Sequence, residues 1–134
     1  MQDVFLTGAT GTIGSAILEV FASTNEFSVD CLQRRPDSRA QIESLGGTFL
    51  LGDMTDTDSF HRVIGRKDYS YIIHAAQAHF GEHPASTIHA MDVQAVANLE
   101  RLRSAATKLM VYTSGVWIFG HQKEEVRKSE TTPH

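Results

Sequence analysis

A glycine-rich segment near the amino terminus limits the possible folds of this chain more than any other feature. Its sequence is Leu6-Thr7-Gly8-Ala9-Thr10-Gly11-Thr12-Ile13-Gly14, and it separates an apolar run from a helical pattern. Gly8 allows a sharp turn out of a strand, Gly11 lets an anion approach the backbone, and Gly14 lets the next helix pack closely against the sheet. Because free amides and the helix dipole attract negative charge, the segment predicts a phosphate-binding turn between a strand and a helix.

The rest of the chain alternates between apolar runs and helical patterns. Runs rich in β-branched, aromatic and aliphatic residues predict parallel strands covered on both faces, at residues 4–7, 27–33, 48–51, 69–74 and 109–113. Amphipathic patterns predict helices at residues 12–25, 37–45, 56–64 and 85–106. With right-handed crossovers, this order predicts an α/β fold, a Rossmann-type doubly wound parallel sheet of about five strands in three layers. We assign residues 1–120 to this domain and residues 121–134 to a polar tail.

The helical patterns also predict which side chains face the sheet. In the first helix the predicted stripe is Ile13, Ala16, Ile17, Val20 and Phe21. In the last helix it is Ile88, Met91, Ala95, Leu99, Leu102 and Ala106. Asp30 is a carboxylate inside the second predicted strand, and its sequence neighbours do not explain it.

Composition argues against several other classes of protein. The 134 residues are 41% hydrophobic and 21% charged, as is ordinary for a globular domain. Twelve Lys and Arg against sixteen Asp and Glu give a net charge of −4, so no basic stripe predicts a nucleic-acid partner. No apolar run approaches the roughly 18 residues of a membrane span, and no signal peptide is evident. Because the single cysteine, Cys31, fits a reducing compartment, we expect a cytoplasmic protein without a membrane partner.

Seven histidines raise the question of a metal site. His79 and His83 have the four-residue spacing of zinc-binding helical pairs, but Gly81 lies between them and Pro84 follows. No third ligand has a motif spacing, so we expect no metal. Neither a Walker phosphate loop nor a Gly-x-Ser-x-Gly nucleophile turn is present.

The end of the second predicted strand indicates which coenzyme the turn would bind. NAD-binding folds place a carboxylate there, roughly 20 residues past the glycines, to bind the ribose hydroxyls. In this chain the position holds Gln33, followed by Arg34 and Arg35. Because guanidinium groups suit a phosphate dianion better than a sugar hydroxyl, we predict NADP, with NAD as the alternative. The competing interpretation is that both arginines belong to a solvated loop before Pro36.

Several segments together resemble the extended short-chain dehydrogenase/reductases, the NAD(P)-dependent epimerase/dehydratase group. Residues 7–14 resemble the TGATGxxG turn of that family, and Gly52-Asp53-Met54-Thr55-Asp56 is similar to its GDxxD segment. His74-Ala75-Ala76 resembles the HxA segment after the fourth strand. Residues 91–102 look like the long fourth helix, and residues 112–120 look like the end of the fifth strand.

The resemblance implies a set of site residues. Asp53 would contact the adenine amino group beside Met54, and Ala75, Ala76 and Thr113 would flank the nicotinamide. With the turn and the two arginines, the predicted coenzyme-binding residues are Gly8, Thr10, Gly11, Thr12, Ile13, Gly14, Arg34, Arg35, Asp53, Met54, Ala75, Ala76 and Thr113. The resemblance further implies a small-molecule substrate for the full-length protein and a homodimer formed through the helix at residues 85–106.

The catalytic residues of that family are where this chain departs from the pattern. Tyr69, Tyr71 and Tyr112 are the only tyrosines, and none begins the Tyr-x-x-x-Lys pair that supplies the proton in the family. The serine or threonine that assists this pair would be Ser114. We therefore expect a chain truncated before the Tyr-x-x-x-Lys helix of an NADP-dependent oxidoreductase or epimerase/dehydratase. The alternative is a catalytically silent dinucleotide-binding module that acts as a sensor or regulator.

Overall fold

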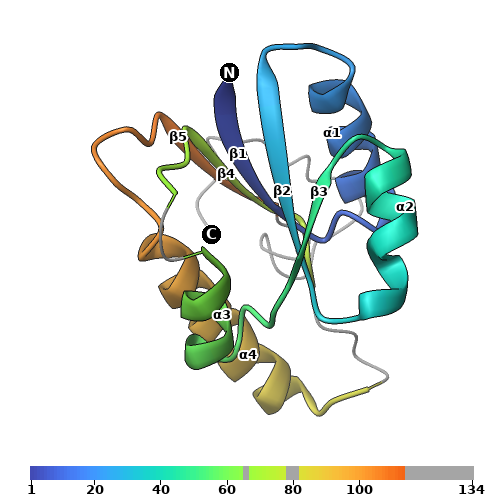
Figure 1. The fold of residues 1–134 in the computed structure, drawn as a ribbon. Coiled ribbons are helices and arrows are strands. Elements are labelled where there is room, and N and C mark those ends of the chain that lie inside the picture. Colours follow the sequence, from blue (N-terminus) through green and yellow to red (C-terminus); the bar gives the residue numbers. More distant parts are fainter. Residues whose placement is uncertain (65–66, 78–81, 114–134) are drawn as a thin grey trace, which may run out of the picture.

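The computed structural model describes residues 1–64, 67–77 and 82–113. Five parallel strands form one sheet in the order β3-β2-β1-β4-β5 (Figure 1). The strands are β1 (Gln2–Thr7), β2 (Phe27–Gln33), β3 (Thr48–Leu51), β4 (Tyr71–His74) and β5 (Leu109–Tyr112). The helices are α1 (Thr12–Ala22), α2 (Arg39–Ser44), α3 (Thr57–Ile64) and α4 (Ala85–Glu100), and a short 3-10 turn, η1 (Pro36–Ser38), precedes α2.

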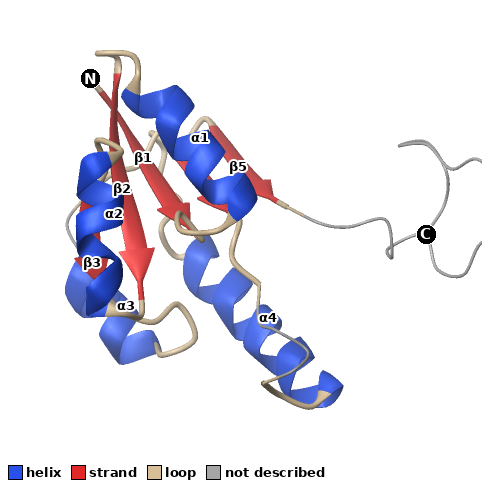
Figure 2. Ribbon diagram, turned by 90° about the vertical axis from the view of Figure 1, so that its right-hand side faces the viewer, coloured by secondary structure: helices blue, strands red, loops and turns tan. Residues whose placement is uncertain are grey.

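Helices cover both faces of this sheet. Leu18 of α1 and Ile42 of α2 pack on one face, against side chains such as Val4. Phe60 of α3 and Leu99 of α4 pack on the other. Figure 1 shows α1 and α2 to the right of the strands and α3 and α4 at the lower left, and Figure 2 shows α1 and α2 in front of the strands. The predicted Rossmann-type α/β fold is therefore confirmed, because alternate side chains along each central strand enter two separate cores.

The face of α1 that contacts the sheet differs from the prediction. Gly14 and Leu18 are its buried residues, whereas Ile13 is 60% exposed and Val20 is 68% exposed. The predicted stripe is thus wrong for these two residues and for Ala16, which is also exposed, whereas Ile17 and Phe21 pack against the core as predicted. The apolar surface of α1 is wider than the sheet can cover, and a periodicity count cannot tell which part of a wide stripe makes the contact.

Helix α4 is shorter than predicted. It ends at Glu100, so residues 101–106 lie outside it. Two hydroxyl groups favour the early end. The Thr107 hydroxyl accepts from the Ser104 amide at 3.1 Å and donates to the Tyr69 carbonyl at 2.9 Å, and the Ser104 hydroxyl accepts from the Ala106 amide at 3.2 Å. Side chains of this kind compete with helical backbone bonds. The expected dimer helix at residues 85–106 is therefore corrected to Ala85–Glu100.

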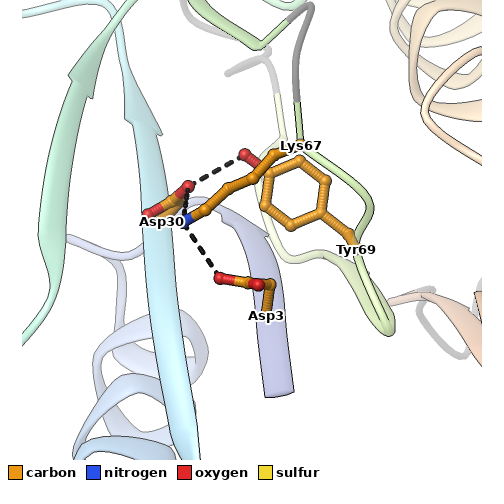
Figure 3. Close-up of polar contacts among 4 residues, drawn as sticks. All are labelled: Asp3, Asp30, Lys67 and Tyr69. Carbon is orange, nitrogen blue, oxygen red and sulfur yellow. Dashed lines mark hydrogen bonds and ion pairs between the residues drawn. The ribbon is translucent and has the colours of Figure 1, made fainter. Parts of the chain in front are cut away.

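Asp30 has a structural explanation that its sequence neighbours did not offer. Its side chain is almost fully buried, and one carboxylate oxygen accepts hydrogen bonds from Lys67 Nζ and the Tyr69 hydroxyl, both at 2.9 Å (Figure 3). Lys67 Nζ also lies 2.9 Å from an oxygen of Asp3. A buried carboxylate is tolerated when it is paired and hydrogen-bonded in this way. The cluster joins the loop before β4 to strands β1 and β2.

The two carboxylates of this cluster change the pKa of Tyr69 and of Lys67. Burial, followed by the charge of Asp30, raises the pKa of Tyr69 far above its ordinary value. For Lys67, burial alone would lower the pKa, but hydrogen bonds and charges from Asp30 and Asp3 outweigh it, and the pKa is raised. The tyrosine therefore stays neutral and the lysine stays charged at neutral pH.

Candidate functional site

A cavity of about 440 Å³ opens at the carboxyl ends of the strands. It lies where the chain changes direction in the sheet, since β1 has β2 on one side and β4 on the other. Such switch points are where open α/β sheets bind ligands. The lining residues from the loops after β1 to β4 are Thr7, Gly8, Thr10, Gly11, Leu32, Gln33, Arg34, Arg35, Gly52, Asp53, Met54, Thr55, Ala75, Ala76 and Gln77. Those before or within α4 are Glu82, His83, Met91, Asp92 and Ala95.

The three glycines of the first turn serve different purposes. Gly8 has a φ of +76°, and a Cβ there would lie 2.5 Å from the carbonyl group of Ala75. A Cβ on Gly14 would lie 1.9 Å from the Gly8 carbonyl oxygen, so this glycine lets the helix approach the turn itself. At Gly11 a Cβ would meet only the Gly8 oxygen, at 3.4 Å. Packing therefore requires glycine at positions 8 and 14. A side chain at position 11 would obstruct only a ligand inside the cavity.

The amino terminus of α1 meets this turn. Gly11 is its N-cap, no side chain caps it, and its first turn contains no acidic residue. The partial positive charge of the helix is therefore not neutralised by its own sequence. The side chains of Thr12 and Ile13 line a separate apolar hollow along α1, so only their backbone groups belong to the turn.

Two arginines and a glutamine stand at the end of β2. Arg34 and Arg35 are exposed, line the cavity, and form no ion pair within the part of the chain that the structure describes. The Gln33 Nε2 atom is buried and has no hydrogen-bond partner among the placed residues. Three donor groups thus surround the position where NAD-binding folds carry an acid.

The loop after β3 presents one carboxylate in a defined orientation. Asp53 Oδ1 accepts hydrogen bonds from the Thr55 amide at 2.8 Å and the Thr55 hydroxyl at 2.7 Å. The Asp53 amide donates to the Ser59 hydroxyl at 3.0 Å, and the Gly52 amide donates to the Gln33 carbonyl at 2.9 Å. These bonds hold the loop against β2 and α3, so Asp53 faces the cavity from a rigid support.

A buried histidine supports the floor beside the alanines. His74 Nδ1 lies 2.7 Å from the hydroxyl of Thr7, which lines the cavity. Burial lowers the pKa of His74, although the charge of Asp92 acts in the opposite direction. The ring is therefore neutral near pH 7. Its Nε2 atom is buried without a partner in the described portion of the chain.

The structure brings together most of the residues predicted from the sequence. One cavity contains Gly8, Thr10, Gly11, Arg34, Arg35, Asp53, Met54, Ala75 and Ala76. Four others do not line it, namely Thr12, Ile13, Gly14 and Thr113. Thr113 instead donates its hydroxyl to the His74 carbonyl at 2.8 Å. Ser114 lies outside the described residues.

Sequence reasoning missed the wall that α4 contributes. Met91, Asp92 and Ala95 line the cavity from this helix. The apolar stripe predicted for α4 already contained Met91 and Ala95. A polar residue beside such a stripe, as Asp92 is, was the available signal for a wall that faces a ligand. Gln33 was noticed only as the place where an acid was missing.

Within residues 1–64, 67–77 and 82–113, no three His, Cys, Asp or Glu side chains are grouped so that they could hold a metal ion. In the same ranges, none of the helices combines the length and the apolar character needed to cross a bilayer.

Comparisons with known proteins agree with this geometry. Residues 4–134 match the NAD dependent epimerase/dehydratase family. The methionine adenosyltransferase 2 subunit beta of Bos taurus is 25% identical over 131 residues, which are 95% of this chain and 36% of that protein. The chain thus spans about a third of the length of this curated relative.

Solved structures show the same fold. The crystal structure of gox2253 matches with a TM-score of 0.79 and 26% identity, over 100% of this chain and 40% of that one. The UDP-glucose 4-epimerase from Bifidobacterium longum, solved with NAD+ and UDP, matches with a TM-score of 0.75 and 20% identity. The latter match covers 98% of this chain and 42% of that structure.

Proposed function

The chain belongs to the NAD dependent epimerase/dehydratase family, and we propose that its cavity binds NADP in preference to NAD. Binding of a nicotinamide dinucleotide follows from the family. The preference rests on one observation, which is that the end of β2 carries two arginines in place of a carboxylate, and neither arginine forms an ion pair with another described residue. A phosphate dianion is the group that two guanidinium ions bind best.

The cavity fits a dinucleotide in two further respects. Packing within the protein does not require a glycine at position 11. A pyrophosphate bound at the uncapped start of α1 would use the space that this glycine leaves. The buried Nε2 of Gln33 has no acceptor among the described residues, and ribose or phosphate oxygens would supply one. In this arrangement Asp53 and Met54 hold the adenine, and Ala75 and Ala76 flank the nicotinamide.

A bound nicotinamide dinucleotide supplies the hydride chemistry, while this chain binds and orients it. The neutral His74 keeps Thr7 in place without adding charge under the coenzyme. Ser114 follows Thr113 directly, and we assign to its hydroxyl the hydrogen bond to a substrate oxygen. Within the whole protein we expect an oxidoreductase, epimerase or dehydratase acting on a small molecule.

A second candidate function is a dinucleotide-binding module without catalysis. The observation that favours it is the lack of a Tyr-x-x-x-Lys pair in the 134 residues. The relative from Bos taurus is named as a subunit of methionine adenosyltransferase 2, which is a different activity from hydride transfer. A whole protein that binds NADPH tightly but oxidises none of it with a panel of carbonyl substrates would support this candidate.

The coenzyme preference is tested by titrating the protein with NADPH and with NADH. We expect NADPH to bind at least about tenfold more tightly, since charge-assisted bonds contribute roughly 1.5–3 kcal/mol each. Replacing Arg34 and Arg35 together by alanine should abolish the difference while leaving NADH affinity unchanged. Arg62→Ala, at an exposed position of α3 away from the cavity, is the matched control. Equal affinities in the unmodified protein would overturn the assignment of NADP.

A further inference from the structure

Asn98 is a wholly buried polar side chain on α4. It is 0% exposed and has apolar, buried neighbours on the same helix in Ala95 and Leu99. A buried amide is unfavourable unless its donor and its acceptor are both hydrogen-bonded. Its presence among apolar residues therefore points to a specific connection.

Both ends of the amide are hydrogen-bonded, by groups of the segment that leads from β3 into α3 and by Gln94 of the same helix. Asn98 Nδ2 donates to the Met54 carbonyl oxygen at 2.6 Å. Asn98 Oδ1 accepts from the Thr57 hydroxyl and from Gln94 Nε2, each at 3.2 Å. Gln94 Nε2 also lies 3.4 Å from the Thr57 hydroxyl, so the three side chains form a closed network. It connects α4 to the loop after β3 and to the first residue of α3.

This network lies behind two walls of the coenzyme cavity. One wall is the loop with Asp53 and Met54, and the other is the face of α4 with Asp92 and Ala95. Asn98 itself does not line the cavity. It is three residues after Ala95, so it lies one helical turn further along the same face. Its bond to the Met54 carbonyl thus joins the two walls from behind.

We propose that Asn98 is a positioning residue that holds the loop of Asp53 and Met54 at the correct distance from α4, so that the adenosine half of the coenzyme fits between them. The inference rests on the proposed function, because it assigns a role within the same cavity. It predicts that loss of the Met54 bond weakens the adenosine half specifically. The phosphate grip of the first turn, which Asn98 does not touch, should remain.

Asn98→Asp tests this inference because it keeps the shape and the acceptor but removes the donor to Met54. Two probes are titrated: adenosine 2′,5′-bisphosphate for the adenosine side and inorganic pyrophosphate for the glycine turn. We expect the variant to bind the adenosine probe about tenfold more weakly, the ratio expected from one lost hydrogen bond, and to bind pyrophosphate within about twofold of the unmodified protein. Lowering the pH should restore adenosine binding, because a protonated carboxyl again has a donor.

Other results separate the two proposals. Unchanged binding of both probes in a folded variant, or an equal loss for both, would overturn the role of Asn98. The same holds if the unmodified protein binds pyrophosphate but not the adenosine probe. Failure of the unmodified protein to bind either probe or NADPH would instead remove the proposed function, and the inference with it. If Asn98→Asp does not fold, Gln94→Ala loosens the same amide, and an unaltered affinity for adenosine 2′,5′-bisphosphate would then count as refutation.

Discussion

Replacing Tyr69 by phenylalanine removes one hydroxyl from the cluster around Asp30. That hydroxyl donates to Asp30 at 2.9 Å, and the tyrosine side chain is only 1% exposed. Hydrogen bonds to a charged group contribute about 1.5–3 kcal/mol. We expect the free energy of unfolding to fall by roughly that amount at neutral pH, while Lys67 continues to pair with Asp30.

The effect should also depend on pH with a defined sign. Burial and the charge of Asp30 raise the pKa of Tyr69 in the folded protein, whereas the unfolded tyrosine loses its proton at about pH 10. Above that pH the folded state binds more protons than the unfolded state, so stability decreases as the pH rises. One proton corresponds to about 1.4 kcal/mol per pH unit. The phenylalanine variant lacks this contribution, so its disadvantage should shrink by about that much per unit above pH 10.

The assay is urea unfolding followed by circular dichroism, from neutral pH to about pH 11. Tyr71→Phe is the matched control, because Tyr71 packs against Phe21 and Phe27 on the opposite face of the sheet. The control keeps Tyr69, so it should lose stability above about pH 10 as the unmodified protein does. The reasoning would be refuted by a Tyr69→Phe variant within about 0.5 kcal/mol of the unmodified protein at pH 7, or by a difference that stays constant up to pH 11.

Three further predictions concern the site and its surroundings. Gly11→Ala should leave the melting temperature nearly unchanged but abolish NADPH binding. Gly14→Ala should unfold the protein, because the new Cβ would lie 1.9 Å from the Gly8 carbonyl oxygen. Calorimetry with and without NADPH distinguishes these two outcomes. Since burial lowers the pKa of His74, the unfolded state binds more protons than the folded state below about pH 6.5, and the free energy of unfolding should decrease there as the pH falls. In urea titrations, His74→Gln should reduce this decrease. Burial and the charge of Asp30 raise the pKa of Cys31 to about 12, so iodoacetamide should label this thiol only in denaturant, and labelling of the native protein would contradict its buried position.

Local patterns were sufficient for the elements that depend on local chemistry. The strands at Phe27–Gln33 and Thr48–Leu51 have the predicted bounds, because a continuous apolar run between polar turns marks a strand on its own. The glycine turn was also predicted, since the positive φ of Gly8 and the close approach of Gly14 to Gly8 both arise within one short segment. Parallel order then followed from the alternation of strands and helices.

Contacts between distant segments could not be predicted in the same way. Asp30 was unexplained until folding brought Lys67 and Tyr69 to it from 37 and 39 residues away. Asn98 was unremarked in the last helix until Met54, 44 residues earlier, appeared at its amide. Three exposed residues of α1 were wrongly assigned to its contact side, because a wide apolar stripe permits several rotations of the helix.

The order of residues along this chain is thus enough to identify the strands, the glycine turn and the arginines at the end of β2, because each depends on groups within a few residues of one another. The cavity, its α4 wall and the buried polar bonds behind it exist only after the chain has closed on itself. A buried charge or amide is stable only with partners, and those partners are supplied by packing across the sheet rather than by neighbours in sequence.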